Sequence, residues 1–116
     1  MDIFVVSYYI PGTLAADHTL EFKLPFDAQL IHVSLSNSAN TAGWVKVGTT
    51  GGDANYMVFK DIGDSEVAAE YDWDDFVSSQ YPHIPAATNI IVSVDYNGTA
   101  GTAAANAVIN LMFTRG

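Results

Sequence analysis

The chain has 116 residues, no cysteine and a formal net charge of −9, with 13 acidic residues against four Lys and Arg. A chain of this length buries a core without cross-links, so we expect a single domain over residues 1–116. The absence of cysteine excludes disulfides and thiolate metal sites. The four cations are scattered, which removes the basic surface needed to bind nucleic acid or anionic membranes. We therefore expect neither of these as a partner.

The first strand is predicted over residues 2–10. Its apolar run is too short to span a bilayer and has no basic flank, so it does not resemble a secretory signal. A strand that is apolar on both faces is either central in its sheet or covered by a partner chain. We favour burial in the core and keep a subunit contact as the alternative. The two faces are Ile3, Val5, Ser7 and Tyr9 on one side and Phe4, Val6, Tyr8 and Ile10 on the other.

Alternation of apolar and polar residues continues along the first half of the chain. Residues 18–26 predict a strand with Leu and Phe inward, ended by Pro25, which cannot donate to a sheet. Residues 31–36 and 44–48 alternate on either side of the polar stretch SNSANTAG. We expect these two runs to be neighbouring antiparallel strands of one half-buried sheet.

The second half of the chain is punctuated by turns. The Gly-rich residues 48–55 lack a following Lys-Ser/Thr and a helix, so they indicate a turn rather than a phosphate site. A short strand follows at 56–59, and residues 66–71 fit either a strand or one helical turn. Residues 72–76 predict a helical turn capped by Asp72 or Asp74.

Two further strands, residues 89–96 and 107–113, close the chain around a polar turn at 97–106. The Asn97-Gly98-Thr99 sequence within this turn fits a glycosylation pattern, but we interpret it as part of the turn. Seven to eight strands with no long helix predict an all-β fold, a single-domain antiparallel β-sandwich of jelly-roll-like type.

Residues 61–75 hold seven of the 13 acids. Their spacing does not match a calcium loop, so we favour a solvated acidic loop over a metal site, with a patch that meets a basic partner as a third possibility. One cluster in a short chain gives little material for the facing carboxyls of a glycosidase. His18, His32 and His83 are far apart, and no serine nucleophile motif is present. We therefore expect no enzyme, no metal and no cofactor.

Trp44, Trp73, Tyr71 and Tyr81 are the aromatic candidates for binding, because exposed rings stack on sugars or anchor protein interfaces. We favour a structural role for Trp44 at an end of the core, and weigh both roles equally for Trp73. These aromatics support an alternative function, as a carbohydrate-binding lectin-like module or a receptor-binding part of a phage fibre.

Four segments together resemble small virion proteins of tailed bacteriophages. They are the hairpin PFDAQLIHVSLSNSANTAGWVKVG (25–48), the segment EYDWDDFVSSQYPHIPAATNIIVSVDYNG (70–98), the Gly/Ala-rich turn 99–106 and the terminal strand AVINLMFTRG (107–116). Arg115 stands where the resemblance would place an acid, and residues 2–10 lie outside the pattern.

The resemblance implies a head decoration (cement) protein of jelly-roll type. Such a protein sits on the outer capsid surface of the virion after synthesis in the host cytoplasm. It binds the major capsid protein and bridges its subunits, usually as a homotrimer at three-fold and quasi-three-fold positions. In that role we expect Asp2, Ile3, Phe4 and Val5 to make a capsid or subunit contact. Asp72, Trp73, Asp74 and Asp75 are a second candidate, facing basic capsid residues, and this acidic group should lie away from the three-fold axis.

Overall fold

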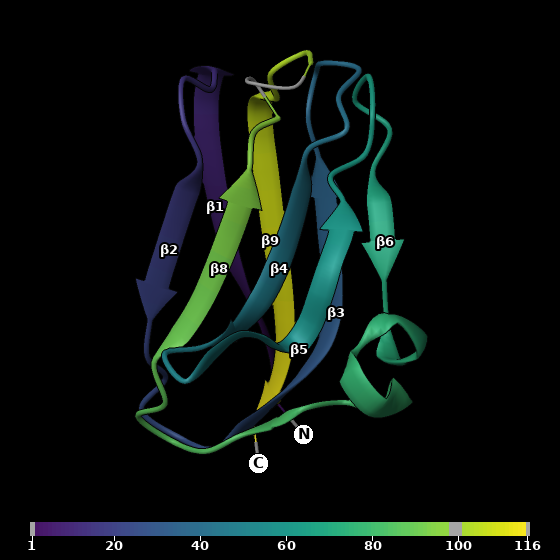
Figure 1. The fold of residues 1–116 in the computed structure, drawn as a ribbon. Helices are drawn as coiled ribbons and strands as arrows, with labels where there is room; N and C mark the ends of the chain where they lie inside the picture. The colour runs from purple at the N-terminus through teal and green to yellow at the C-terminus, as the bar shows by residue number, and fades with distance from the viewer. Residues whose placement is uncertain (1, 98–100, 116) are drawn as a thin grey trace.

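Two antiparallel sheets lie face to face in the computed structural model, which describes residues 2–97 and 101–115 (Figure 1). Sheet A has the order β1-β9-β3-β6, with β7 also paired to β3, and sheet B has the order β2-β8-β4-β5. The strands of sheet A are β1 (Ile3–Thr13), β3 (Ala28–Ser36), β6 (Ala69–Tyr71), β7 (His83–Ile84) and β9 (Ala105–Arg115). Those of sheet B are β2 (His18–Phe22), β4 (Trp44–Thr49), β5 (Gly52–Asp61) and β8 (Ile90–Asp95).

The antiparallel pairs are nested along the chain. β1 pairs with β9, β2 with β8, β3 with β6 and β4 with β5. One long hairpin wrapped into two sheets produces this order, and it is the jelly-roll-like arrangement that the strand pattern predicts. The expected all-β sandwich is therefore confirmed, with nine strands in the part of the chain that the structure describes.

The core lies between the sheets and is filled by alternate residues of the central strands. Val33, Leu35, Val45 and Val47 are fully buried, as the alternation in their strands predicts. Phe113 is also fully buried. Further aromatic rings pack around Phe113: Phe4 stacks on it at 5.3 Å between ring centroids, and Phe22 meets it edge-on at 6.2 Å. Each such aromatic pair contributes roughly 0.5–1.5 kcal/mol beyond the area it buries.

The predicted pairing of residues 31–36 with residues 44–48 is wrong, because β3 and β4 lie in different sheets. Alternation specifies which side chains are buried, but it does not specify the partner strand. The connection between them crosses from one sheet to the other and is held by its own polar side chains. The amide of buried Asn37 donates to the Gly63 carbonyl at 2.6 Å, and the hydroxyl of Thr41 donates to the Thr102 carbonyl at 2.6 Å.

The interpretation of residues 2–10 as a central strand is also wrong. β1 is the edge strand of sheet A and pairs only with β9 among the described strands. Its inward side chains, such as Phe4 and Val6, pack against the core, whereas Ile3 and Val5 are exposed. The sequence shows two apolar faces, and the topology shows that the face with Ile3 and Val5 is exposed at the edge of sheet A.

The loops largely follow the sequence predictions. The Gly-rich segment is the turn of the β4–β5 hairpin, in which Thr49 pairs with Gly52. Gly48 is required there, because a Cβ at this position would lie 2.2 Å from the Gly52 carbonyl oxygen. The segment left open at 66–71 contains strand β6. The predicted turn at 97–106 falls partly on residues 98–100, which lie outside the described residues.

Two 3₁₀ turns, η1 (Trp73–Asp75) and η2 (Val77–Ser79), follow β6 and are the helical elements of the described chain. Asp72 caps η1: its side chain accepts a bond from the Asp74 amide, as predicted for an aspartate at this position. Across residues 2–97 and 101–115, no helix has the length and apolar character to cross a membrane.

Candidate interaction surfaces

The N-terminal candidates lie along the free edge of sheet A. Ile3 and Val5 point away from the core and are 58% and 49% exposed, and Tyr9, further along the same face, is 56% exposed. Phe4 points the other way and packs on Phe26 and Phe113, so its ring belongs to the core. Asp2 is exposed just before the strand.

Strand β9 extends this apolar surface. Its outward residues Val108 and Met112 are half-buried and lie opposite Tyr9 and Val5 in the antiparallel register. We call the set Ile3, Val5, Tyr9, Val108 and Met112 the β1–β9 stripe. Val108 and Met112 were not identified as surface candidates from the sequence, although both alternate with the residues predicted to point inward in 107–113. Their proximity to the N-terminal strand depends on pairing between the two ends of the chain, which alternation does not reveal.

The two strands that carry the β1–β9 stripe are nearly free of charge; the acids beside them are Asp2, before β1, and Glu66, which lines a hollow with Tyr9 and Val108. The 22 residues of β1 and β9 (11 + 11) include no acid and one cation, Arg115, in a chain with 13 acids. The guanidinium of Arg115 lies over the Phe26 ring, 4.5 Å from its centroid. A long edge strand with exposed apolar side chains and no charges of its own lacks the usual protection against pairing with other chains.

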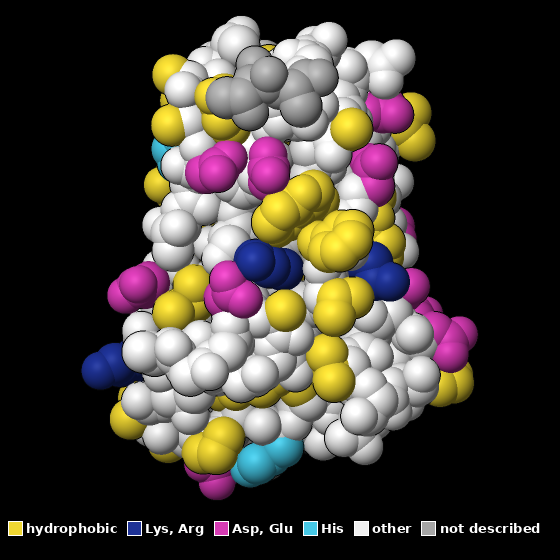
Figure 2. Space-filling view, in the orientation of Figure 1, with side chains coloured by type: hydrophobic (Ala, Val, Ile, Leu, Met, Phe, Trp, Pro, Cys, Tyr) yellow, Lys and Arg dark blue, Asp and Glu magenta, His cyan; other side chains and the backbone are white. Residues whose placement is uncertain are grey.

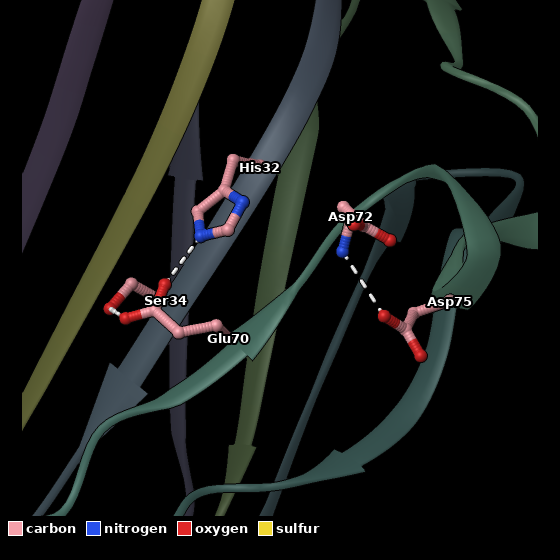
Figure 3. A network of polar contacts seen from close by, with 5 residues as sticks. All are labelled: His32, Ser34, Glu70, Asp72 and Asp75. Carbon is pink, nitrogen blue, oxygen red and sulfur yellow. Dashed lines mark hydrogen bonds and ion pairs between the residues drawn. The ribbon is translucent and has the colours of Figure 1, made fainter.

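A polar network of three side chains joins β3 and β6 in sheet A (Figure 3). His32 on β3 bonds through Nε2 to Oε2 of Glu70 on β6, and Ser34 donates to Oε1 of Glu70 at 3.0 Å. The bond to His32 is the main reason that the pKa of Glu70 lies below its ordinary value; the bond to Ser34 lowers it further, while partial desolvation opposes both.

The acidic candidates Asp72, Trp73, Asp74 and Asp75 form and flank η1. Asp72 and Asp75 cap this turn reciprocally, because Oδ2 of Asp75 accepts from the Asp72 amide at 3.1 Å (Figure 3). Two of the three carboxylates therefore have a local structural role. Asp74 is exposed, and the Trp73 side chain is 44% exposed.

The structure does not bring the two candidate groups together. β1 and β6 are opposite edges of sheet A, three strand spacings apart, or roughly 14 Å at the usual spacing. Tyr71, in β6 beside η1, donates its hydroxyl to the Asp61 carbonyl at 2.6 Å. Burial first, and then the negative charges of Asp61 and Asp75, raise the pKa of Tyr71. Negative charge is therefore concentrated at the edge that lies opposite β1.

Sheet B has an outer face of a different kind (Figure 2). Trp44 does not cover an end of the core as predicted; it is half-buried on this face, 5.6 Å between ring centroids from Phe59, which is 65% exposed. Figure 2 shows hydrophobic side chains gathered over β4 and β5, with cations and acids beside them. The Lys46 ammonium lies 5.1 Å from the centre of the Trp44 ring and 2.9 Å from Oδ2 of Asp53.

The three histidines are dispersed, with His18 in β2, His32 in β3 and His83 in β7. Within residues 2–97 and 101–115, no three His, Asp or Glu side chains are grouped in a way that would hold a metal ion. The candidate sites among the described residues are three surfaces: the β1–β9 stripe, the η1 segment and the aromatic face of sheet B.

Comparisons with known proteins bear on the fold. No protein-family model matches the sequence, and no curated protein matches it either. A chain of the cyanophage Pam1 capsid asymmetric unit is similar in structure, with a TM-score of 0.55 and 16% sequence identity. The similarity covers 97% of this chain and 82% of that chain, so the two share a fold over nearly the whole sandwich.

Proposed function

We propose that this chain is a non-catalytic structural protein of a phage virion. It decorates the outer surface of the head, binds the major capsid protein and stabilises the shell by bridging neighbouring capsid subunits. The shared fold with a chain of the cyanophage Pam1 capsid asymmetric unit supports a place in a capsid. The observation that carries the proposal is the exposed β1–β9 stripe on two strands that contain no acidic residue.

The β1–β9 stripe is the contact between copies of the chain, which associate as a homotrimer. Copies that each carry a charge of −9 repel one another unless they meet where acids are absent. β1 and β9 offer such a surface, and Ile3 and Val5 supply apolar area to bury on it. A stable contact buries roughly 800 Å² per partner, so the neighbouring outward side chains of the same strands would be covered as well.

The η1 segment is the contact with the capsid. In a trimer formed through β1 and β9, the opposite edge of sheet A with Asp72, Trp73, Asp74 and Asp75 points away from the three-fold axis. Exposed Trp73 supplies an aromatic anchor, and exposed Asp74 supplies charge that favours a basic partner. Three weak capsid contacts linked in one trimer bind far more tightly than one, because the second and third form at high effective concentration.

Two measurements separate these roles. Light scattering coupled to size-exclusion chromatography should give the mass of a trimer for the wild-type chain and of a monomer for Ile3→Asp/Val5→Asp. Co-sedimentation with capsids of the phage that encodes the chain should show binding by wild type and a clear loss for Trp73→Ala, which should remain a trimer. A wild-type chain that is monomeric at all concentrations would overturn the trimer. A trimer that does not sediment with these capsids would overturn the decoration role.

A further inference from the structure

We propose that the outer face of sheet B carries a binding site for a neutral saccharide, with room for a single sugar ring. The site is a shallow hollow of about 190 Å³ over β2, β8 and β4. Pockets that enclose a whole drug-sized ligand measure roughly 300–1,000 Å³, so this hollow suits one small ring. Its lining side chains include Asp17, Thr19, Trp44, Lys46, Ser93 and Asp95.

The strand register explains the shape of the hollow. Ser93 on β8 lies between Thr19 on β2 and Lys46 on β4. The short hydroxyl side chains of Ser93 and Thr19 are therefore next to the long side chain of Lys46. In the next row, Trp44 lies opposite Asp95. The larger β4 side chains therefore form a wall, with Ser93 and Thr19 as the low floor. Phe59 does not line the hollow; it is on β5, on the other side of β4, and its exposed ring packs against the Trp44 ring.

The acceptors at the other end are fixed in place by the backbone. Oδ1 of Asp17 accepts from the Tyr96 amide at 3.1 Å, and Oδ1 of Asp95 accepts from the Asn97 amide at 2.8 Å. In each carboxylate the second oxygen makes no hydrogen bond to any other residue in the described ranges 2–97 and 101–115. Preorganised acceptors reduce the cost of ordering groups when a ligand binds.

This set of groups suits a polyol better than an ion. An anion would face the carboxylates of Asp17, Asp53 and Asp95. The ammonium group of Lys46 already occupies the face of the Trp44 ring, and its positive charge would repel a cation that bound there. A neutral sugar offers C–H groups to the Trp44 ring and hydroxyls to both the carboxylates and the ammonium group.

The test uses the full chain with Trp73→Phe, which leaves Trp44 as the only tryptophan. Methyl glycosides of glucose, galactose, mannose and N-acetylglucosamine, with choline and acetate as charged probes, are titrated while tryptophan emission and ¹⁵N amide spectra are recorded. We expect at least one neutral glycoside to saturate the signal and to shift the amides around Ser93, Lys46 and Trp44. No response to any neutral glycoside, or a response to choline or acetate alone, overturns the proposal.

Variants then locate the site. Thr19→Tyr fills the hollow from an exposed position on β2 and should weaken the responding glycoside at least tenfold. Ser93→Tyr should do the same, and circular dichroism shows whether each variant is folded. Val77→Tyr, on exposed η2 at the far edge, is the matched control and should bind as wild type. Unchanged affinity in a folded Thr19→Tyr protein overturns the location. Because this readout needs neither trimer nor capsid, its failure leaves the decoration role untouched.

Discussion

The outer faces of the two sheets differ in what surrounds their exposed apolar side chains. On sheet A, Ile3 and Val5 lie on an edge whose strands contain no acid. On sheet B, Trp44 and Phe59 lie beside a hollow lined by carboxylates, hydroxyls and an ammonium group. Apolar area on strands without acidic residues suits another protein surface, whereas the same area beside many fixed polar groups suits a small polar ligand. We therefore propose association through sheet A and ligand binding through sheet B.

The largest expected effect comes from placing charge on the β1–β9 stripe. Ile3→Asp/Val5→Asp removes two apolar contacts worth roughly 1.5–3 kcal/mol each, so the dissociation constant of the trimer should rise by more than about 100-fold. Analytical ultracentrifugation over a range of concentrations measures the change. Val67→Asp/Val77→Asp adds the same two charges at exposed positions outside the stripe and should leave the trimer intact. Equal dissociation in both variants would show that total charge, rather than this edge, controls association.

A second prediction concerns the aromatic face of sheet B. Phe59→Ala removes the ring that packs against Trp44 and should weaken glycoside binding by about 2- to 13-fold, which corresponds to the roughly 0.5–1.5 kcal/mol of that aromatic pair. The trimer should be unaffected. Val58→Ala is the control, since Val58 is the exposed neighbour on the same strand. A shift in trimer affinity with unchanged glycoside binding would reverse the assignment of the two faces.

A third prediction tests the cap of η1. Asp72→Ala removes the capping bond to the Asp74 amide and should cost about 1 kcal/mol of unfolding free energy, measured by urea denaturation. Asp74→Ala, in the same segment, removes an equal charge but no capping acceptor and should cost less. If both substitutions have the same effect, the carboxylates act through charge alone.

The smallest expected effect belongs to Glu70 and depends on pH. Folding lowers the pKa of Glu70, so its carboxylate adds stability at neutral pH that is lost as pH falls below the ordinary value of 4.5 and through the folded value. Glu70→Gln should therefore be slightly less stable than wild type at pH 7, and the difference should shrink toward pH 3. Urea denaturation at several pH values measures it, and a constant difference would contradict the assigned cause.

Local patterns in the sequence predict much of the fold and less of the surfaces. Alternation identifies the buried side of nearly every strand, and the Asp72 cap follows from residue type. The partners of the strands could not be predicted, because a period of two says nothing about which strand lies alongside. That limit produced the wrong pairing of residues 31–36 with 44–48. For the same reason the sequence could not show that Met112 lies beside Val5 on sheet A, or that Asp95 lies beside Trp44 on sheet B.

The measurement that tests the central claim most directly is cryo-electron microscopy of the virion that carries this chain. We predict that the sandwich domain lies on the outer surface of the head in groups of three. Within each group the β1–β9 stripes face one another, and η1 contacts the major capsid protein. Finding the chain elsewhere in the particle, or on the head with Ile3 and Val5 exposed to solvent, would contradict it.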